Sequence, residues 1–341
     1  MKNAYPVTIL RGDGIGPEVM DATLAVLRAT GIAFDFHTQP VGEEAERLFG
    51  TGLPQQTLES IERDHVALKG PTATPVAGNR KSYNLDLRQR FDTYANVRPV
   101  RIHPGVVTRY SDEAINLVVV RENTEGEYSA VEAQNPLDDS IESTARYTPE
   151  GCRRIAQFAF DYVRSHGRKK VTAIHKANIF QMSHGLFLNT ARAVASKYPD
   201  IEFEDMIADN FFQQLILRPS QFDVVIATNL LGDLASDAAA ALVGGLGLAP
   251  GANVGGEYAI FEAVHGTADN IAGKGLANPS SLILSAAMML DHLDEQDAGD
   301  HVRKALDKTL ESGQRTGDIK TKRQGLASGT EQFTRSIIAN L

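Results

Sequence analysis

The 341-residue chain has almost no cysteine, no excess of positive charge and no long apolar run. Its single cysteine, Cys152, excludes an intrachain disulfide framework and any site built on a Cys-x-x-Cys motif. The 34 basic and 43 acidic residues give a formal net charge of −9, which argues against a general nucleic-acid binder. The most apolar segment, 238–249, is shorter than the roughly 20 residues of a membrane span. We therefore expect neither a nucleic-acid partner nor a membrane association.

The start of the chain carries no recognisable targeting signal, because a strand-like segment begins at Pro6. We expect a cytoplasmic protein, or one from the mitochondrial matrix if a presequence was removed. At about 150 residues per domain, the length suggests roughly two domains. No internal repeat, low-complexity tract or long linker separates them, which suggests that one domain is inserted into the other.

Short β-branched runs alternate with helical stretches along the chain. Strands are predicted at 7–10, 32–36, 117–120, 171–174 and 224–227, and helices at 17–29, 149–166, 185–197 and 302–312. A further helix is expected near the end. This alternation predicts an α/β fold with a largely parallel sheet.

A glycine cluster, Gly12-Asp-Gly14-Ile-Gly16, follows the first predicted strand and invites a dinucleotide-binding interpretation. The fingerprint G-x-G-x-x-G fails, because its last position is occupied by Pro17. We therefore favour a tight strand-to-helix turn, which could still line a ligand site beyond the strand ends.

Three arginines are candidates for ligand binding. Arg88 lies on a predicted helix, Arg121 follows the strand predicted at 117–120, and Arg98 lies in the segment 94–99. Ser82 could cap the helix that carries Arg88, which would then lie on the same face about two turns below. Guanidinium groups match carboxylate geometry, so converging arginines would suit a polycarboxylate. Taken singly, each arginine is better explained as a surface charge or an ion-pair partner.

Two residues with proton-transfer chemistry follow predicted strands. Tyr128 ends the segment 121–128, and Lys176 comes directly after the strand at 171–174. A lysine near other cations or a metal can titrate low enough to move protons. The alternatives are a surface lysine and a half-buried core tyrosine.

Carboxylates follow the strand predicted at 224–227. Asp233 and Asp237 are i, i+4 neighbours on one face if a helix begins near Gly232. A divalent cation such as Mg²⁺ or Mn²⁺ would relieve their repulsion, because these ions take oxygen ligands. A helix cap beside a surface acid is the alternative. Asp209 offers a third oxygen ligand, although spacing alone does not place it there.

Taken together, these segments resemble the β-decarboxylating dehydrogenase family, which includes isocitrate, isopropylmalate, homoisocitrate and tartrate dehydrogenases. The resemblance runs from Gly12 to about Leu293 and rests on the motifs RENTEGEY (121–128), HKAN (175–178), NLLGDLASD (229–237), GGLGLAPGAN (244–253) and FEAVHGTA (261–268).

The resemblance implies an isocitrate/isopropylmalate dehydrogenase-like α/β fold, which is not a Rossmann fold. Residues 1–94 and 244–341 would form a large cofactor-binding domain. Residues 95–243 would form a smaller inserted domain for dimerisation and substrate binding, with a clasp-like segment near 127–148. A homodimer or higher homo-oligomer with shared active sites is therefore expected.

Roles for individual residues also follow from the resemblance. The catalytic residues would be Tyr128 and Lys176 of the partner subunit. A tricarboxylate substrate would contact Ser82, Asn84, Arg88, Arg98 and Arg121. Asp233 and Asp237, with Asp209 of the partner subunit, would hold Mg²⁺ or Mn²⁺. The cofactor would contact Thr74, Glu262, His265, Gly266, Thr267, Ala268, Asn270, Ile271 and Asn278.

Cofactor choice depends on Asn270 and Ile271, where NADP-using relatives carry lysine and tyrosine. NAD-using relatives generally have aspartate and isoleucine, so Ile271 agrees and Asn270 departs. Asparagine can still hydrogen-bond ribose hydroxyls. The resemblance, with Ser82 and Asn84 similar to the isocitrate dehydrogenase pattern, implies NAD-dependent oxidative decarboxylation of isocitrate. The alternatives are homoisocitrate or 3-isopropylmalate oxidation, or a non-catalytic regulatory subunit.

Overall fold

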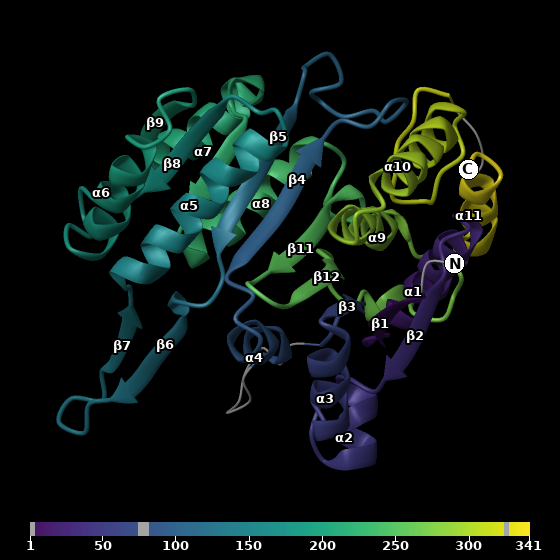
Figure 1. The fold of residues 1–341 in the computed structure, drawn as a ribbon, viewed down its shortest axis with the longest axis horizontal. Coiled ribbons are helices and arrows are strands. Elements are labelled where there is room, and N and C mark those ends of the chain that lie inside the picture. Colours follow the sequence, from purple (N-terminus) through teal and green to yellow (C-terminus); the bar gives the residue numbers. More distant parts are fainter. Residues whose placement is uncertain (1–3, 74–81, 324–326) are drawn as a thin grey trace.

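The computed structural model describes residues 4–73, 82–323 and 327–341, and it confirms the α/β class (Figure 1). The strands are β1 (Tyr5–Leu10), β2 (Phe34–Gln39), β3 (Val66–Lys69), β4 (Ala95–Arg101), β5 (Asn116–Glu122), β6 (Gly126–Gln134), β7 (Ile141–Arg146), β8 (Lys170–His175), β9 (Glu202–Ile207), β10 (Val224–Ala227), β11 (Pro250–Val254) and β12 (Ala259–Ala263). The α-helices are α1 (Gly16–Ala29), α2 (Glu43–Phe49), α3 (Gln55–Asp64), α4 (Tyr83–Arg90), α5 (Pro149–Ser165), α6 (Ser183–Ala195), α7 (Ala208–Leu217), α8 (Asn229–Leu242), α9 (Ser280–His292), α10 (Gln296–Glu311) and α11 (Thr330–Ile338). Short 3₁₀ turns lie at η1 (Pro219–Gln221), η2 (Leu246–Leu248) and η3 (Asp269–Ile271).

A single large sheet runs through the molecule in the order β2-β1-β3-β12-β11-β4-β5-β10-β8-β9. Its two ends are parallel, as predicted, but its middle is not: β12 with β11, β11 with β4 and β4 with β5 are antiparallel. The short connection between β11 and β12 explains part of this difference, because a turn of this length can only join antiparallel strands. Neither of these two strands was predicted from the sequence.

The two predicted domains occupy the two halves of this sheet. Strands from 95–243 lie on one side and those from 1–94 and 244–341 on the other, and they meet where Ala252 pairs with Val97 and Asn253 with Asn96. The Asn96 and Asn123 amides both donate to Asn253 Oδ1 at 2.8 Å, so buried amides link the halves. The sheet is thus continuous across the predicted boundary.

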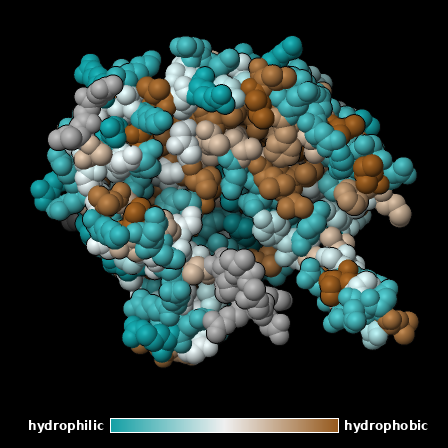
Figure 2. Space-filling view, turned by 180° about the vertical axis from the view of Figure 1, so that it is seen from behind, coloured by the Kyte–Doolittle hydropathy of each residue, from teal (hydrophilic) through white to brown (hydrophobic). Residues whose placement is uncertain are grey.

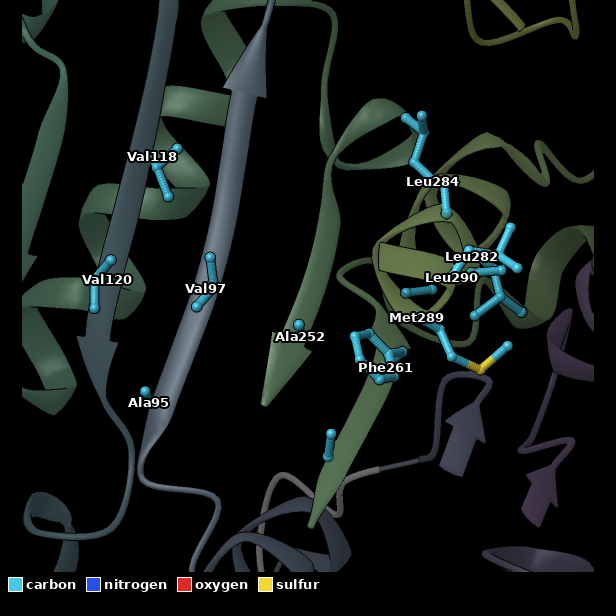
Figure 3. Packing of buried hydrophobic residues seen from close by; sticks show 14 of the residues in the cluster. Ala95, Val97, Val118, Val120, Ala252, Phe261, Leu282, Leu284, Met289 and Leu290 are labelled. Carbon is cyan, nitrogen blue, oxygen red and sulfur yellow. The ribbon is translucent and has the colours of Figure 1, made fainter. Parts of the chain in front are cut away.

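Helices cover both faces of the sheet. In Figure 1, α5 lies in front of β5, whereas α8 lies behind β4 and β5. The core is aliphatic and fills the space between β-branched strand residues and the covering helices; Figure 3 shows Val97, Val118 and Val120 on the strands and Leu284 and Met289 on α9. In the described part of the chain, no helix is both long and apolar enough to span a membrane.

The segment predicted to be clasp-like forms a two-stranded antiparallel hairpin of β6 and β7, which projects from the body (Figure 1). Its apolar side chains Val131, Leu137 and Ile141 are exposed, Leu137 to 92%. A hairpin that leaves large apolar groups in solvent is typical of a surface that another chain covers.

Candidate active site

Two of the predicted substrate-binding arginines lie on neighbouring central strands. Arg98 on β4 and Arg121 on β5 are both buried, and Arg121 is only 1% exposed. Strand side chains alternate between the faces of a sheet. Val97 and Val120 enter the core on one face, and Arg98 and Arg121 point to the face covered by α8.

The helix α8 brings the carboxylates to these arginines. It begins at Asn229, three residues before the predicted start, and still places Asp233 and Asp237 on one face. Arg98 Nη1 donates to Asp237 Oδ1 at 3.0 Å and lies 3.6 Å from Asp233 Oδ1. Arg121 forms an ion pair with Asp233 and donates to Asn229 Oδ1 at 2.7 Å.

Gly232 allows this close approach of helix and strand. A Cβ at this position would lie 2.6 Å from Arg121 Cβ and 3.2 Å from its Cα. Any larger residue would push the first turn of α8 away from β5. The glycine in the motif NLLGDLASD is therefore a packing requirement of the arginine–carboxylate cluster.

Tyr128 on β6 completes the cluster from the side of the hairpin. Its hydroxyl donates to Asp233 Oδ2, and the Arg121 guanidinium carbon lies 4.7 Å from the centre of its ring. Burial, together with the hydrogen bond to Asp233, raises the pKa of Tyr128 above its usual value. The phenol is therefore held in its protonated form at neutral pH.

The charges in the cluster perturb one another. Burial, reinforced by the neighbouring cation Arg88, lowers the pKa of Arg121 to about 9. Burial alone would raise the pKa of Asp233, but attraction to Arg121 and Arg98 outweighs it and lowers that pKa. Burial and repulsion from Asp233 raise the pKa of Asp237. Perturbed groups gathered at one place are typical of a functional site.

Arg88 on α4 reaches the same region through a buried ionic network. It donates to Glu262 Oε1 at 3.0 Å, and Lys69 at the end of β3 lies 3.2 Å from Glu262 Oε2. Asn253 also donates to Glu262, at 2.8 Å. Glu262 was predicted to contact the cofactor, but within the chain its carboxylate is engaged by these three partners. It therefore positions Arg88, whether or not a cofactor also approaches.

Unpaired donors remain in the arginine cluster. Within the described ranges, Arg88 Nε and Arg98 Nε are buried and have no hydrogen-bond partner. A buried guanidinium N–H without a partner is costly. These donors, together with the surplus of four cations (Arg88, Arg98, Arg121 and Lys69) over the three carboxylates of Asp233, Asp237 and Glu262, fit an anionic ligand.

The other predicted substrate residues flank Arg88. Ser82 occupies the N-cap position of α4, where its side chain accepts no capping hydrogen bond from a described residue. Asn84 accepts a hydrogen bond from Thr72 Oγ1 at 3.1 Å. The predicted cofactor residue Thr74 lies outside the described residues.

The predicted cofactor loop follows β12 and rests on the glycine turn after β1. The Thr267 carbonyl accepts from Ile15 N at 2.9 Å, and a Cβ on Gly14 would lie 2.2 Å from that carbonyl oxygen. Gly14 also adopts a left-handed φ of 58°. The tight-turn interpretation of the glycine cluster is thus confirmed.

Within this loop, His265 is anchored by Nδ1 to the Gly266 carbonyl at 3.0 Å, while its buried Nε2 has no partner among the described atoms. Ala268 has a left-handed φ of 43° and precedes η3. Asn270 is exposed, and Ile271 packs partly against the core.

Asn278, the last of the residues predicted to contact the cofactor, lies in the segment before α9. Its amide donates to Asp318 at 2.9 Å, and its Oδ1 accepts from Ser280 N. These bonds fix the side chain at the start of α9.

Lys176 and Asp209 form an ion pair with each other, between the loop after β8 and the first turn of α7. Across the described residues, no group of three or more His, Cys, Asp or Glu side chains is placed to hold a metal. One chain thus brings Tyr128, Asp233 and Asp237 together and keeps Lys176 with Asp209. That arrangement is compatible with the prediction that a partner subunit supplies the second pair.

Several residues of the site were not predicted. Asn229 and Ser236 hold the arginines, and Lys69 and Asn253 hold Glu262. Asn229 and Ser236 lie one helical turn from the predicted aspartates, which was a usable signal. Lys69 offered none, because a buried lysine cannot be told from a surface one by its neighbours in sequence.

Exposed apolar side chains occur on both α7 and α8. Ile216 and Leu217 on α7 and Leu234 on α8 are exposed, and Leu234 adjoins Asp233. Figure 2 views the face that carries α8 and shows a hydrophilic hollow with apolar side chains beside it and the projecting hairpin. A subunit that covers this apolar surface would also reach the edge of the site.

Comparison with known proteins identifies the family of the chain. The family model of isocitrate/isopropylmalate dehydrogenases matches residues 6–337. An NAD-dependent isocitrate dehydrogenase catalytic subunit of Arabidopsis thaliana is 44% identical over 98% of this chain and 88% of its own length. An NADP isocitrate dehydrogenase of Thermus thermophilus is 45% identical over 98% of this chain and 67% of its own.

The solved structure of isocitrate dehydrogenase from Methylococcus capsulatus superimposes with a TM-score of 0.94 at 45% identity, covering 98% of this chain and 99% of that one. The fold and the sequence match thus extend over nearly all of the chain. The chain is a dehydrogenase of the isocitrate/isopropylmalate dehydrogenase family.

Proposed function

We propose that this protein catalyses the NAD-dependent oxidative decarboxylation of isocitrate to 2-oxoglutarate and CO₂. The observation that carries the proposal is the cluster of buried Arg98 and Arg121 around Asp233 and Asp237, with the Tyr128 hydroxyl at the same carboxylate. Such a cluster combines groups that bind carboxylates, groups that can bind a cation and a proton donor.

The arginines account for the affinity for a tricarboxylate. Arg88, Arg98 and Arg121 are buried cations, and Arg88 and Arg98 each keep an Nε–H that has no partner among the described residues. Guanidinium forks bind carboxylates through paired hydrogen bonds, so three arginines match the three carboxylates of isocitrate. Ser82 and Asn84 at the start of α4 would contact the carboxylate that distinguishes isocitrate from 3-isopropylmalate.

The donor set also fits a divalent cation. Asp233 and Asp237 supply hard carboxylate oxygens on one helix face, and Asp209 of the partner subunit would supply a third. When bound, Mg²⁺ or Mn²⁺ would act as a Lewis acid toward the substrate oxygens, and NAD would accept two electrons. The guanidiniums that now neutralise both aspartates would turn to the substrate carboxylates.

Proton transfer is divided between two side chains. Oxidation of the substrate's secondary alcohol releases the hydroxyl proton, for which Lys176 of the partner subunit would be the acceptor. Loss of the carboxylate β to the new ketone as CO₂ leaves an enolate that needs a proton on carbon. The phenol of Tyr128, protonated at neutral pH because of its raised pKa, would donate that proton.

The proposed preference for NAD over NADP is based on two residues of η3. Asn270 is exposed at the site predicted for the adenosine ribose, and Ile271 is partly packed into the core. Neither side chain can form an ion pair with a 2′-phosphate. The relatives include NAD-dependent and NADP-dependent enzymes, so these two positions support NAD within a family that uses both.

A homodimer with shared active sites is part of the proposal. Exposed apolar side chains occur on α7, α8 and the β6–β7 hairpin, and Lys176 and Asp209 lie together on one chain. A symmetric partner would cover the apolar surface and deliver both residues at once.

A steady-state assay tests the activity. Purified protein with Mg²⁺ and NAD should form NADH with isocitrate at a higher kcat/KM than with homoisocitrate or 3-isopropylmalate. A higher kcat/KM for either other acid would move the assignment to that substrate. Failure to reduce NAD or NADP with any of the three would leave the regulatory-subunit interpretation.

Subunit complementation tests the shared site. Tyr128→Phe and Lys176→Met homodimers should each be nearly inactive. In a mixed dimer, one site has both defects and the other has neither, so equal mixing and reassembly should restore about one quarter of wild-type activity. Mixing without recovery would place both residues in the same subunit's site.

A further inference from the structure

A cavity of about 750 Å³ lies on the face of the sheet opposite α8. Its floor is formed by β4 and β11, at the junction of the two halves of the sheet. Figure 3 shows Val97 and Ala252 on these strands, with Phe261 and Leu284 beside them; all four line the cavity. Its volume lies within the range of small-molecule sites, which is about 300–1,000 Å³.

One wall is an aromatic ladder on α5. Phe158, Tyr162 and His166 are spaced by four residues and therefore lie along one helix face. The Tyr162 and His166 rings are stacked at 3.8 Å between centroids with planes 17° apart, and Phe158 and Tyr162 are nearly parallel at 6.3 Å. His166 is fixed by a bond between Nδ1 and the Tyr162 carbonyl at 3.0 Å.

The opposite wall is apolar and carries further rings. Leu284, Met288 and His292 follow one another at four-residue spacing on α9, and the His292 and Phe261 rings lie 5.6 Å apart. Met288 is partly exposed toward the cavity, and thioethers make favourable contacts with aromatic faces. The cavity is thus bounded by rings on both sides.

The cavity carries little free charge. Each of its arginines has a carboxylate partner: Arg101 with Asp307 at 2.9 Å, Arg168 with Asp223 at 2.6 Å, and Arg303 with Asp291. Burial lowers the pKa of His166 and of His292, and it raises the pKa of Tyr162. These rings are therefore neutral near pH 7.

We propose that this cavity is a second ligand site, which binds an uncharged, flat, fused-ring aromatic or heteroaromatic molecule between α5 and α9. Aromatic walls recognise planar rings through stacking and edge contacts. The neutral imidazoles and the phenol can exchange hydrogen bonds with ring heteroatoms. A charged ligand would have to displace a paired carboxylate or guanidinium. The site is independent of the dehydrogenase site, which lies on the other face of the sheet.

Indole is a suitable probe, because the protein contains no tryptophan and indole can be excited at wavelengths longer than those that the protein's tyrosines absorb. Its binding to the full-length protein would be followed by fluorescence anisotropy with saturating NAD, which occupies the cofactor site. Indole-3-carboxylate is the matched anionic probe. Tyr162→Ala removes the central ring of the ladder, and Met288→Leu is the volume-conserving control. Circular dichroism would verify that each variant is folded.

Indole should bind at least tenfold more tightly than indole-3-carboxylate, Tyr162→Ala should weaken indole binding about 5- to 10-fold, and Met288→Leu should change it less than twofold. Met288→Trp should fill the cavity and abolish the saturation-transfer NMR signal of indole. This second variant blocks the cavity while the aromatic side chains of α5 remain unchanged. The proposal is overturned if NAD displaces indole, if the anion binds as well, or if Met288→Trp leaves binding unchanged.

Discussion

We predict that substitution of Glu262, which lies at the centre of a buried ionic network, lowers both the stability of the protein and its affinity for substrate. Glu262 is 6% exposed, and its oxygens engage Lys69 at 3.2 Å, Arg88 at 3.0 Å and Asn253 at 2.8 Å. Burial opposes ionisation, but Lys69 and Arg88 outweigh it and hold the pKa of Glu262 far below its usual value. Glu262→Gln would leave two buried cations without their anion.

Removing one partner of a buried ion pair typically costs about 3–5 kcal/mol, and we expect this loss in the free energy of unfolding of Glu262→Gln. Lys69→Met should cost less, about 1–3 kcal/mol, because Glu262 keeps Arg88 and Asn253. The double variant should be more stable than the sum of the two single losses implies, by more than about 1 kcal/mol. Urea denaturation of all four proteins measures these values.

The same variants separate two roles of Glu262. If it positions Arg88, Glu262→Gln should raise the KM for substrate more than the KM for NAD. If it contacts the cofactor directly, the KM for NAD should rise more. Additive losses in the unfolding cycle, or a cost of Glu262→Gln below that of Lys69→Met, would refute the role of Glu262 as the shared counter-ion of Lys69 and Arg88.

Three further perturbations follow from the structure. Gly232→Ala should lower stability by about 1–3 kcal/mol and raise the KM for substrate, because the new Cβ would overlap Arg121; unchanged urea midpoints would contradict this packing requirement. Asn270→Asp should increase the kcat/KM ratio of NAD over NADP, since a carboxylate accepts from ribose hydroxyls and repels a 2′-phosphate; an equal ratio would exclude a ribose contact. Burial lowers the pKa of His103, although Asp307 opposes this shift. The unfolded state therefore binds more protons below about pH 6.5, and stability falls with acidification. Between about pH 7.5 and pH 5.5, His103→Gln should lose less stability than the wild type, and equal losses would refute the effect.

Local sequence patterns were sufficient for several elements in the parallel parts of the fold. The predicted strand at 224–227 coincides with β10, and the helix predicted at 149–166 ends one residue earlier as α5. Both have strong local signals: a β-branched run in the first, and a proline start with apolar periodicity in the second. The spacing of Asp233 and Asp237 likewise placed them on one helix face.

The antiparallel middle of the sheet was not predictable in the same way. β11 contains Pro250 and Gly251, which usually argue against a central strand. Its place is set by partners distant in sequence, namely β4 on one side and β12 on the other. The Glu262 network was not predicted for the same reason, since Lys69 and Glu262 are separated by 193 positions in the sequence.

The position of β11 and β12 has a consequence for how the chain assembles. These strands come late in the chain, yet they fill the middle of the sheet, between β3 and β4. Until residues 250–263 have been synthesised, β3 and β4 each present an open edge of unpaired backbone groups, and such edges can pair with other chains. A nascent chain that stalls before residue 250 should therefore be prone to aggregation, and insertion of this strand pair joins two half-sheets that cannot otherwise meet.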